Sequence, residues 1–120
     1  MANYVSTLSG AEVEAALTAA LNGAAKARVL LNGIGTAAIY ESYNVASLTD
    51  IDVGRYDVAF TNVFATADYT PCTCGALGRY VSTRTRTTQL AGSVELNCQN
   101  QPGALADTDL IGCGCIGDLA

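Results

Sequence analysis

The stretch Tyr43–Phe60, YNVASLTDIDVGRYDVAF, decides the fold class of this chain. Over residues 55–60, polar and apolar side chains alternate, the pattern of a strand with one buried and one exposed face. Tyr56, Val58 and Phe60 share the apolar face. We therefore predict a β-strand here whose three large apolar side chains are buried, because a slip of one residue would expose all of them.

Further strands are expected on both sides of this one. The run Tyr43–Asp50 reaches it through the glycine-containing turn Ile51–Gly54, which is typical of a β-hairpin. Other Gly and Pro turn signals separate short runs rich in Val, Ile, Thr, Tyr and Phe, and no helical pattern lies between consecutive strands. The sequence predicts a mainly β fold, an antiparallel β-sandwich or barrel-like domain with a short N-terminal α-helix. The other expected strands are Ala27–Leu31, Thr36–Tyr40, Tyr69–Ala76, Tyr80–Thr87, Ser93–Asn97 and Leu110–Ile116.

The N-terminal part carries a helical pattern over Gly10–Asn22. Ser9 and Glu12 have the spacing of a capping box, in which each side chain satisfies a free backbone N–H of the other residue. Apolar residues at helical spacing form one stripe. The large members of this stripe are Val13, Leu17 and Leu21.

A helix this short is marginal alone in water, so its stripe needs a partner. The stripe could pack on the β-domain of the same chain, or it could form an oligomer seam with symmetry copies; the pattern does not separate these two readings. We divide the chain into an N-terminal helical segment, residues 1–25, which serves attachment or oligomerisation, and a β-rich domain, residues 26–120.

Composition argues against several function classes. The chain has 120 residues, a net charge of −5 and no histidine. Acidic surfaces disfavour nucleic acid and anionic membranes, and the usual general base near neutral pH is missing. No apolar run approaches the length of a membrane span, and the N-terminus does not read as a secretory signal. We expect no enzyme activity, no cofactor, no nucleic-acid partner and no membrane insertion.

The cysteines form two C-x-C pairs and one single residue. On strands, each pair would face one side of its sheet, and the five thiols could converge. Three interpretations stay open: buried core thiols, disulfides formed after release from a reducing cytosol, or a thiolate metal site, against which the C-x-C spacing and the lack of histidine argue. The five residues are Cys72, Cys74, Cys98, Cys113 and Cys115.

Tyr80, Arg84 and Arg86 lie at alternating positions of one expected strand. They form a candidate contact with a partner protein or an anionic glycan, or simply a solvated edge strand whose charges oppose aggregation.

Other polar groups fit ordinary structural roles. The aspartates at positions 50, 52 and 57 surround a glycine turn and could hold calcium, but they lack the later glutamate of an EF-hand loop and fit ordinary turn chemistry. The tyrosines at positions 40, 43, 56, 69 and 80 could stack on sugars or fill a core.

The segment Ala25–Tyr69, AKARVLLNGIGTAAIYESYNVASLTDIDVGRYDVAFTNVFATADY, resembles a recurrent module of tailed-bacteriophage fibre and appendage proteins. The resemblance lies in the order of the NGIG turn, the phrase SYNVASLTD, the strand YDVAFTNVF and the segment ATADY. The phrase LSGAEVEAAL is similar to the helical lead-in that precedes such domains. The cysteines after position 71 depart from the pattern of the module.

This resemblance implies a trimeric virion structural protein, made in the host cytoplasm and located on the tail or capsid surface. Its partners would be copies of itself, other virion proteins and a host surface glycan or receptor. A capsid decoration protein that stabilises the head is the alternative. A carbohydrate-binding module and a glycan-degrading enzyme with a carboxylate pair are further alternatives.

Overall fold

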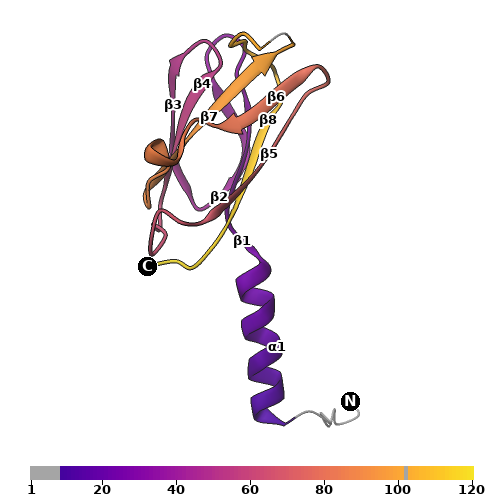
Figure 1. Cartoon of the computed structure of the whole chain (residues 1–120), viewed down its shortest axis with the longest axis vertical. Coiled ribbons are helices and arrows are strands. Elements are labelled where there is room, and N and C mark those ends of the chain that lie inside the picture. Colours follow the sequence, from indigo (N-terminus) through magenta and orange to yellow (C-terminus); the bar gives the residue numbers. More distant parts are fainter. Residues whose placement is uncertain (1–8, 102) are drawn as a thin grey trace.

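The structure, a computed structural model, describes residues 9–101 and 103–120, apart from the side chains of residues 21 and 22. Within these ranges, one α-helix precedes a sandwich of two four-stranded antiparallel sheets (Figure 1). The predicted fold class is therefore confirmed. In chain order the elements are α1 Gly10–Gly23, β1 Ala25–Asn32, β2 Ala38–Tyr43, β3 Val45–Asp52, β4 Arg55–Phe60, β5 Thr70–Gly75, β6 Arg79–Thr83, the 3₁₀-helix η1 Arg86–Thr88, β7 Ser93–Asn100 and β8 Ile111–Ile116.

The strand order is β2-β1-β8-β5 in sheet A and β3-β4-β7-β6 in sheet B. The last strand, β8, lies between β1 and β5, so both ends of the β-domain contribute to the centre of sheet A. In sheet B, β4 pairs with β7 and β7 pairs with β6, while β5 has crossed to sheet A. This return of β7 to lie beside β4 is a Greek-key connection.

The core lies between the sheets and comes from the two central strands of each sheet. The predicted burial of Tyr56, Val58 and Phe60 is confirmed, with exposed fractions of 0%, 0% and 7%. None of the described residues of the four edge strands is buried. Besides those three β4 residues, the inward-facing core side chains of the central strands are Ala27, Val29, Leu31, Val94, Leu96, Cys98, Ile111, Cys113 and Cys115.

An aromatic cluster closes the end of the core nearest α1. The ring of Phe60 meets Phe64 and Tyr69 edge-on, at centroid distances of 5.1 and 5.6 Å, and Phe64 stacks on Tyr69 at 4.3 Å. Tyr69 Oη lies 2.8 Å from the Leu90 carbonyl oxygen, its hydrogen-bond acceptor. Because burial raises the pKa of Tyr69, its hydroxyl stays protonated and can donate this bond.

The expected strand Tyr43–Asp50 begins too early. The chain turns at Asn44, whose φ of 57° lies in the left-handed region that asparagine tolerates. The Asn44 side chain fixes the turn, because its Oδ1 accepts from Asn62 N at 2.7 Å and its Nδ2 donates to the Lys26 carbonyl at 3.1 Å. Tyr43 therefore ends β2, and β3 begins at Val45.

The expected strand Tyr80–Thr87 is wrong at its C-terminal end. β6 stops at Thr83, and η1 follows three residues later. The reason is a cap in which Thr85 Oγ1 accepts from Thr88 N at 3.3 Å and Thr88 Oγ1 accepts from Thr85 N at 3.1 Å. Threonine hydroxyls thus replace the ladder bonds that a strand would need.

Helix α1 projects away from the sandwich, and the chain measures 57 × 32 × 25 Å (Figure 1). Its radius of gyration is 17.6 Å, whereas a compact chain of this length would have about 14 Å. Only Ala24 separates α1 from β1. The predicted helix is confirmed, and it stands as a stalk at one end of the β-domain.

Candidate functional site

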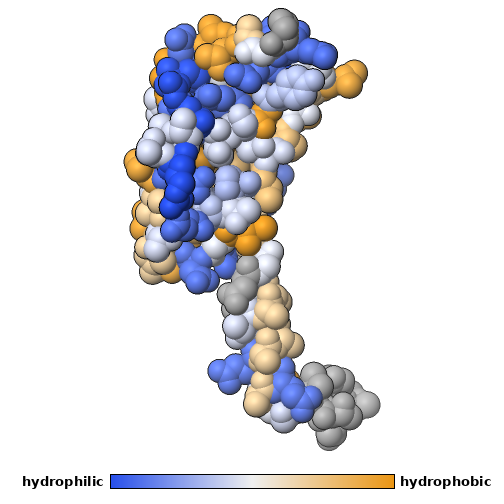
Figure 2. All heavy atoms as spheres, in the orientation of Figure 1, coloured by the Kyte–Doolittle hydropathy of each residue, from blue (hydrophilic) through white to orange (hydrophobic). Residues whose placement is uncertain are grey.

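The stalk helix exposes its apolar stripe. Val13 and Leu17 are 46% and 58% exposed, and all α1 side chains that the structure describes are exposed. Leu21, the third predicted seam residue, lies outside the side chains that the structure describes. On the visible side of the projecting helix, Figure 2 shows weakly hydrophobic residues running along its length beside hydrophilic ones. The reading in which this stripe packs on its own β-domain is therefore wrong for Val13 and Leu17.

The start of the stalk is built as predicted. Glu12 N donates to Ser9 Oγ at 3.1 Å, and Ser9 N donates to Glu12 Oε1 at 3.5 Å, which completes the capping box. Such a cap is worth about 1 kcal/mol, which helps a helix whose described side chains are all exposed. The sequence thus begins the helix at a defined residue while leaving its apolar stripe free.

The end of the sandwich opposite the stalk forms a second candidate surface. Three loops meet there at Asp107, whose Oδ1 accepts from Gly54 N at 2.9 Å and lies 2.5 Å from Tyr56 Oη. Tyr56 Oη also lies 3.0 Å from the Gly33 carbonyl oxygen. Burial, and then the bond to Asp107, raise the pKa of Tyr56, so it remains a donor.

These bonds tie together the β1–β2, β3–β4 and β7–β8 connections. We call these three connections and the β5–β6 turn the distal loops. Several large apolar residues of this end are exposed, although they belong to loops tied to the core. Sequence reasoning missed this surface because it depends on which loops meet in space. The exposed apolar residues are Ile34, Val53, Leu77 and Leu105.

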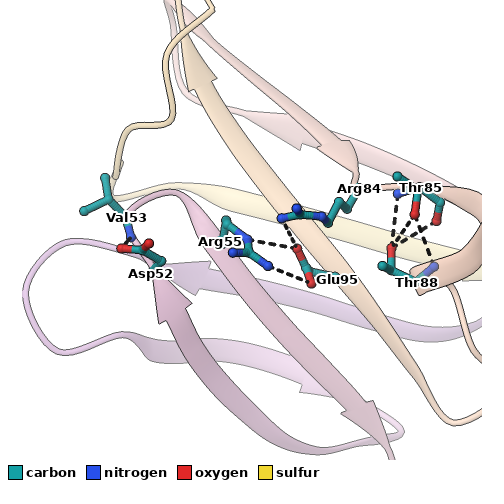
Figure 3. Close-up of polar contacts among 7 residues, drawn as sticks. All are labelled: Asp52, Val53, Arg55, Arg84, Thr85, Thr88 and Glu95. Atoms are coloured by element: carbon teal, nitrogen blue, oxygen red, sulfur yellow. Dashed lines mark hydrogen bonds and ion pairs between the residues drawn. The ribbon is translucent and has the colours of Figure 1, made fainter.

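The outer surface of sheet B carries a charge network centred on Glu95 (Figure 3). Arg55 Nε lies 3.2 Å from Glu95 Oε2, and Arg84 Nη1 lies 3.3 Å from the same oxygen. The Glu95 side chain is only 10% exposed, because the two arginines cover it. A carboxylate held this way by two guanidinium groups fixes the register of three neighbouring strands and leaves little free positive charge for a ligand.

Asp57 lies directly opposite Glu95 on the neighbouring strand. Its partial burial, and then the negative charge of Glu95, raise the pKa of Asp57 above its usual 3.8. A carboxyl group whose pKa is raised in the folded state lowers stability once the pH exceeds the pKa that the group has in the unfolded chain. Asp57 therefore costs stability at neutral pH and costs nothing in strong acid.

Replacing Asp57 with Asn is expected to stabilise the domain at pH 7 and to lose this effect near pH 3. The gain should stay below about 1 kcal/mol, since solvent screens the site, or below about 5 °C in Tm. Thermal unfolding of both chains at the two pH values measures it. A variant that is less stable than the parent at pH 7 would contradict the raised pKa.

The structure separates the predicted contact strip of Tyr80, Arg84 and Arg86. Tyr80 is 56% exposed on β6, and Arg84 follows on the same outer surface but is engaged with Glu95. Arg86 lies in η1 and pairs with Asp68 at 2.6 Å. The expectation of one strip is wrong, because the strand ends before Arg86.

The five cysteines do not gather at one site, so the open possibility of a shared thiol cluster is not realised among these residues. Cys113 and Cys115 point from β8 into the core, with their sulfur atoms 3.8 Å apart, and Cys98 is buried on β7. Cys72 and Cys74 are exposed on β5. The core interpretation therefore holds for the first three and fails for the C-x-C pair of β5, because the inward positions of that strand are Pro71 and Thr73.

The three buried thiols differ in acidity, and the hydrogen bond with Cys113 lowers the pKa of Cys115. Burial raises the pKa of Cys98, and a hydrogen bond with Cys115 together with burial raises the pKa of Cys113. Within the described ranges no group of three or more metal-ligating side chains gathers, and this includes the aspartates around Gly54. Among the tyrosines of the described ranges, Tyr56 and Tyr69 are buried, whereas Tyr40, Tyr43 and Tyr80 are exposed.

A hollow of about 370 Å³ lies near the stalk end. It holds the carboxylates of Asp68 and Asp118, and Asp68 is already paired with Arg86. Its lining residues are Phe64, Ala65, Thr66, Asp68, Tyr69, Gly117 and Asp118.

Fold and surfaces together define an antiparallel β-sandwich on an N-terminal helical stalk. No family model, no curated protein and no solved structure matched the chain. In the described ranges, no helix is long and apolar enough to cross a membrane.

Proposed function

We propose that this chain is a structural protein of a tailed-bacteriophage particle, a homotrimeric fibre or appendage module that attaches the particle to a host surface or to other virion proteins. The observation that carries the proposal is the stalk: a capped helix with Val13 and Leu17 exposed. Apolar residues at helical spacing on a free helix are stabilised when copies of the helix pack together.

The arrangement suits attachment. The stalk joins one end of the sandwich, and the distal loops lie at the other end (Figure 1). Copies bundled along the stalk would present their distal loops side by side, so several weak contacts with a surface would act together and bind strongly. Ile34, Val53 and Leu77 would supply apolar contact there, with Tyr80 at the margin.

Localisation on the particle tests this proposal. Antibodies raised against the purified β-domain should label the tail or its appendages in electron micrographs of the phage that encodes the chain. Label spread over the whole head would instead support a capsid decoration protein. Particles without any label, in preparations where the chain is detected only in the soluble lysate, would overturn a virion role.

A further inference from the structure

The outer surfaces of the two sheets differ sharply in chemistry. Face B, the outer surface of sheet B, carries the Glu95 network and Asp57. Face A, the outer surface of sheet A, has one ion pair between described residues, from Arg28 to Glu41 at 3.0 Å, and Lys26 at its margin donates to the Gly117 carbonyl. Cross-strand pairing defines face A as Arg28, Leu30, Glu41, Tyr43, Cys72, Cys74, Gly112 and Gly114.

The floor of face A is made of glycine. Gly112 and Gly114 are the outward positions of β8 in the centre of the sheet, where glycine weakens a strand and is typical of a close approach by another backbone. A Cβ at Gly112 would lie 2.6 Å from Cys74 Sγ, so its neighbours explain the missing side chain. A Cβ at Gly114 would meet only Ala25 Cβ, at 3.9 Å, so a single copy leaves that space open.

The edge of the same sheet is also uncovered. All six residues of β2 are exposed, and these include Ile39, Tyr40 and Tyr43. An exposed edge strand with apolar side chains invites pairing with another chain unless something covers it. Within the described ranges, Leu30 and Gly114 of face A are therefore partly exposed, and Tyr43 and the rest of the edge strand are exposed.

The described stalk helix is short for an interface. Its 14 residues span about 21 Å, which is two heptads, whereas a stable interface buries about 800 Å² on each partner. Contact between the β-domains would enlarge the interface. Because only Ala24 separates α1 from β1, copies joined along the stalk hold their β1 strands, and hence their A sheets, close to one another.

We propose that face A is the surface on which copies of this chain meet beside the stalk, with the open space over Gly114 filled by the neighbouring copy. This inference rests on the proposed oligomer. Arg28 and Glu41 are exposed by 53% and 66%, so each can exchange its partner for the opposite charge of the next copy at little desolvation cost. Face B, with its internally paired charges, stays in contact with solvent.

The native cysteines test this placement. The full chain, kept reduced, is treated briefly with N-ethylmaleimide, and the labelled peptides are quantified by mass spectrometry. In the assembled chain Cys72 and Cys74 should react about tenfold more slowly than in a monomeric Leu17→Asp variant, because access to the thiol governs the rate. A Ser82→Cys variant reports on face B and should react equally fast in both states. Buried Cys98 is the control for folding.

The outcomes separate the two proposals. If Cys72 and Cys74 react as fast in the assembled chain as in the monomeric Leu17→Asp variant, the placement of face A is overturned and stalk assembly is left intact. A parent chain that is monomeric would overturn the proposed oligomer itself.

A second variant gives an independent readout of face A. Gly114→Arg should lower the mass of the assembly without unfolding the domain, since the space above Gly114 admits a side chain. Ser82→Arg, on face B, should leave the mass unchanged. Equal masses for Gly114→Arg and the parent would contradict the proposed contact.

Discussion

Replacing Leu17 with Asp is expected to convert the proposed oligomer into monomers while the β-domain stays folded. Leu17 lies at the centre of the stripe and touches no core residue, so its charge would oppose packing between helices without disturbing the sandwich. Burying an unpaired carboxylate in each helix costs several kcal/mol per ion, which exceeds what a seam of this length can absorb. Light scattering gives the mass, and thermal unfolding reports on the domain.

The matched control is Ala15→Asp, because Ala15 lies on the opposite side of the helix from Leu17. Both variants place one aspartate in the same helix, so loss of helix propensity is common to them. Only Leu17→Asp should lower the mass. If both variants lower the mass of the assembly, the introduced aspartate disrupts the helix as a whole and not the packing of its apolar stripe.

Gly54→Ala is expected to be the most damaging single-methyl change in the β-domain. Gly54 has a φ of +67°, which costs an L-residue about 1–2 kcal/mol. The added Cβ would also lie 2.5 Å from the Cys98 carbonyl oxygen and 2.8 Å from Ala106 N. These are backbone atoms that cannot rotate away, so we expect a total loss of about 3 kcal/mol or more, measured by urea unfolding.

Gly35→Ala separates backbone strain from the clash. Gly35 has nearly the same φ, +68°, but a Cβ there would meet no atom within 4 Å. Gly35→Ala should therefore lower the free energy of unfolding only by the strain of the positive φ, about 1 kcal/mol. Equal losses for the two variants would show that the β3–β4 turn does not press against the β7–β8 loop as described.

Local patterns made much of this architecture predictable. The alternation around Tyr56, Val58 and Phe60 identified the buried face of β4, because a strand in a sandwich has only two faces to choose between. The helix could be placed from Ser9 and Glu12, since a capping box acts within a few residues of the chain.

Features that depend on strand register could not be predicted. The Glu95 network exists because Arg55 on β4 and Arg84, just after β6, flank β7 from its two sides, and no spacing in the sequence encodes that pairing. Cys72 and Cys74 have the same spacing as the buried pair of β8, but they face outward. The spacing places both residues on one face of their strand, and it does not say whether that face is buried.

Side-chain hydroxyls and amides caused the other differences. Thr85 and Thr88 form a local cap that ends β6, so Arg86 left the predicted strip. Asn44 adopts a left-handed conformation that a β-propensity argument does not anticipate. The distal loops became visible as one surface only through Asp107, which joins segments that are far apart in the chain.

The proposed function requires this chain to work as an assembly built on its stalk. Sedimentation equilibrium of the unmodified full chain measures its mass in solution. We expect a single species of three times the 12.3 kDa chain mass, stable on dilution to micromolar concentration. A species of one chain mass at every concentration measured would contradict it.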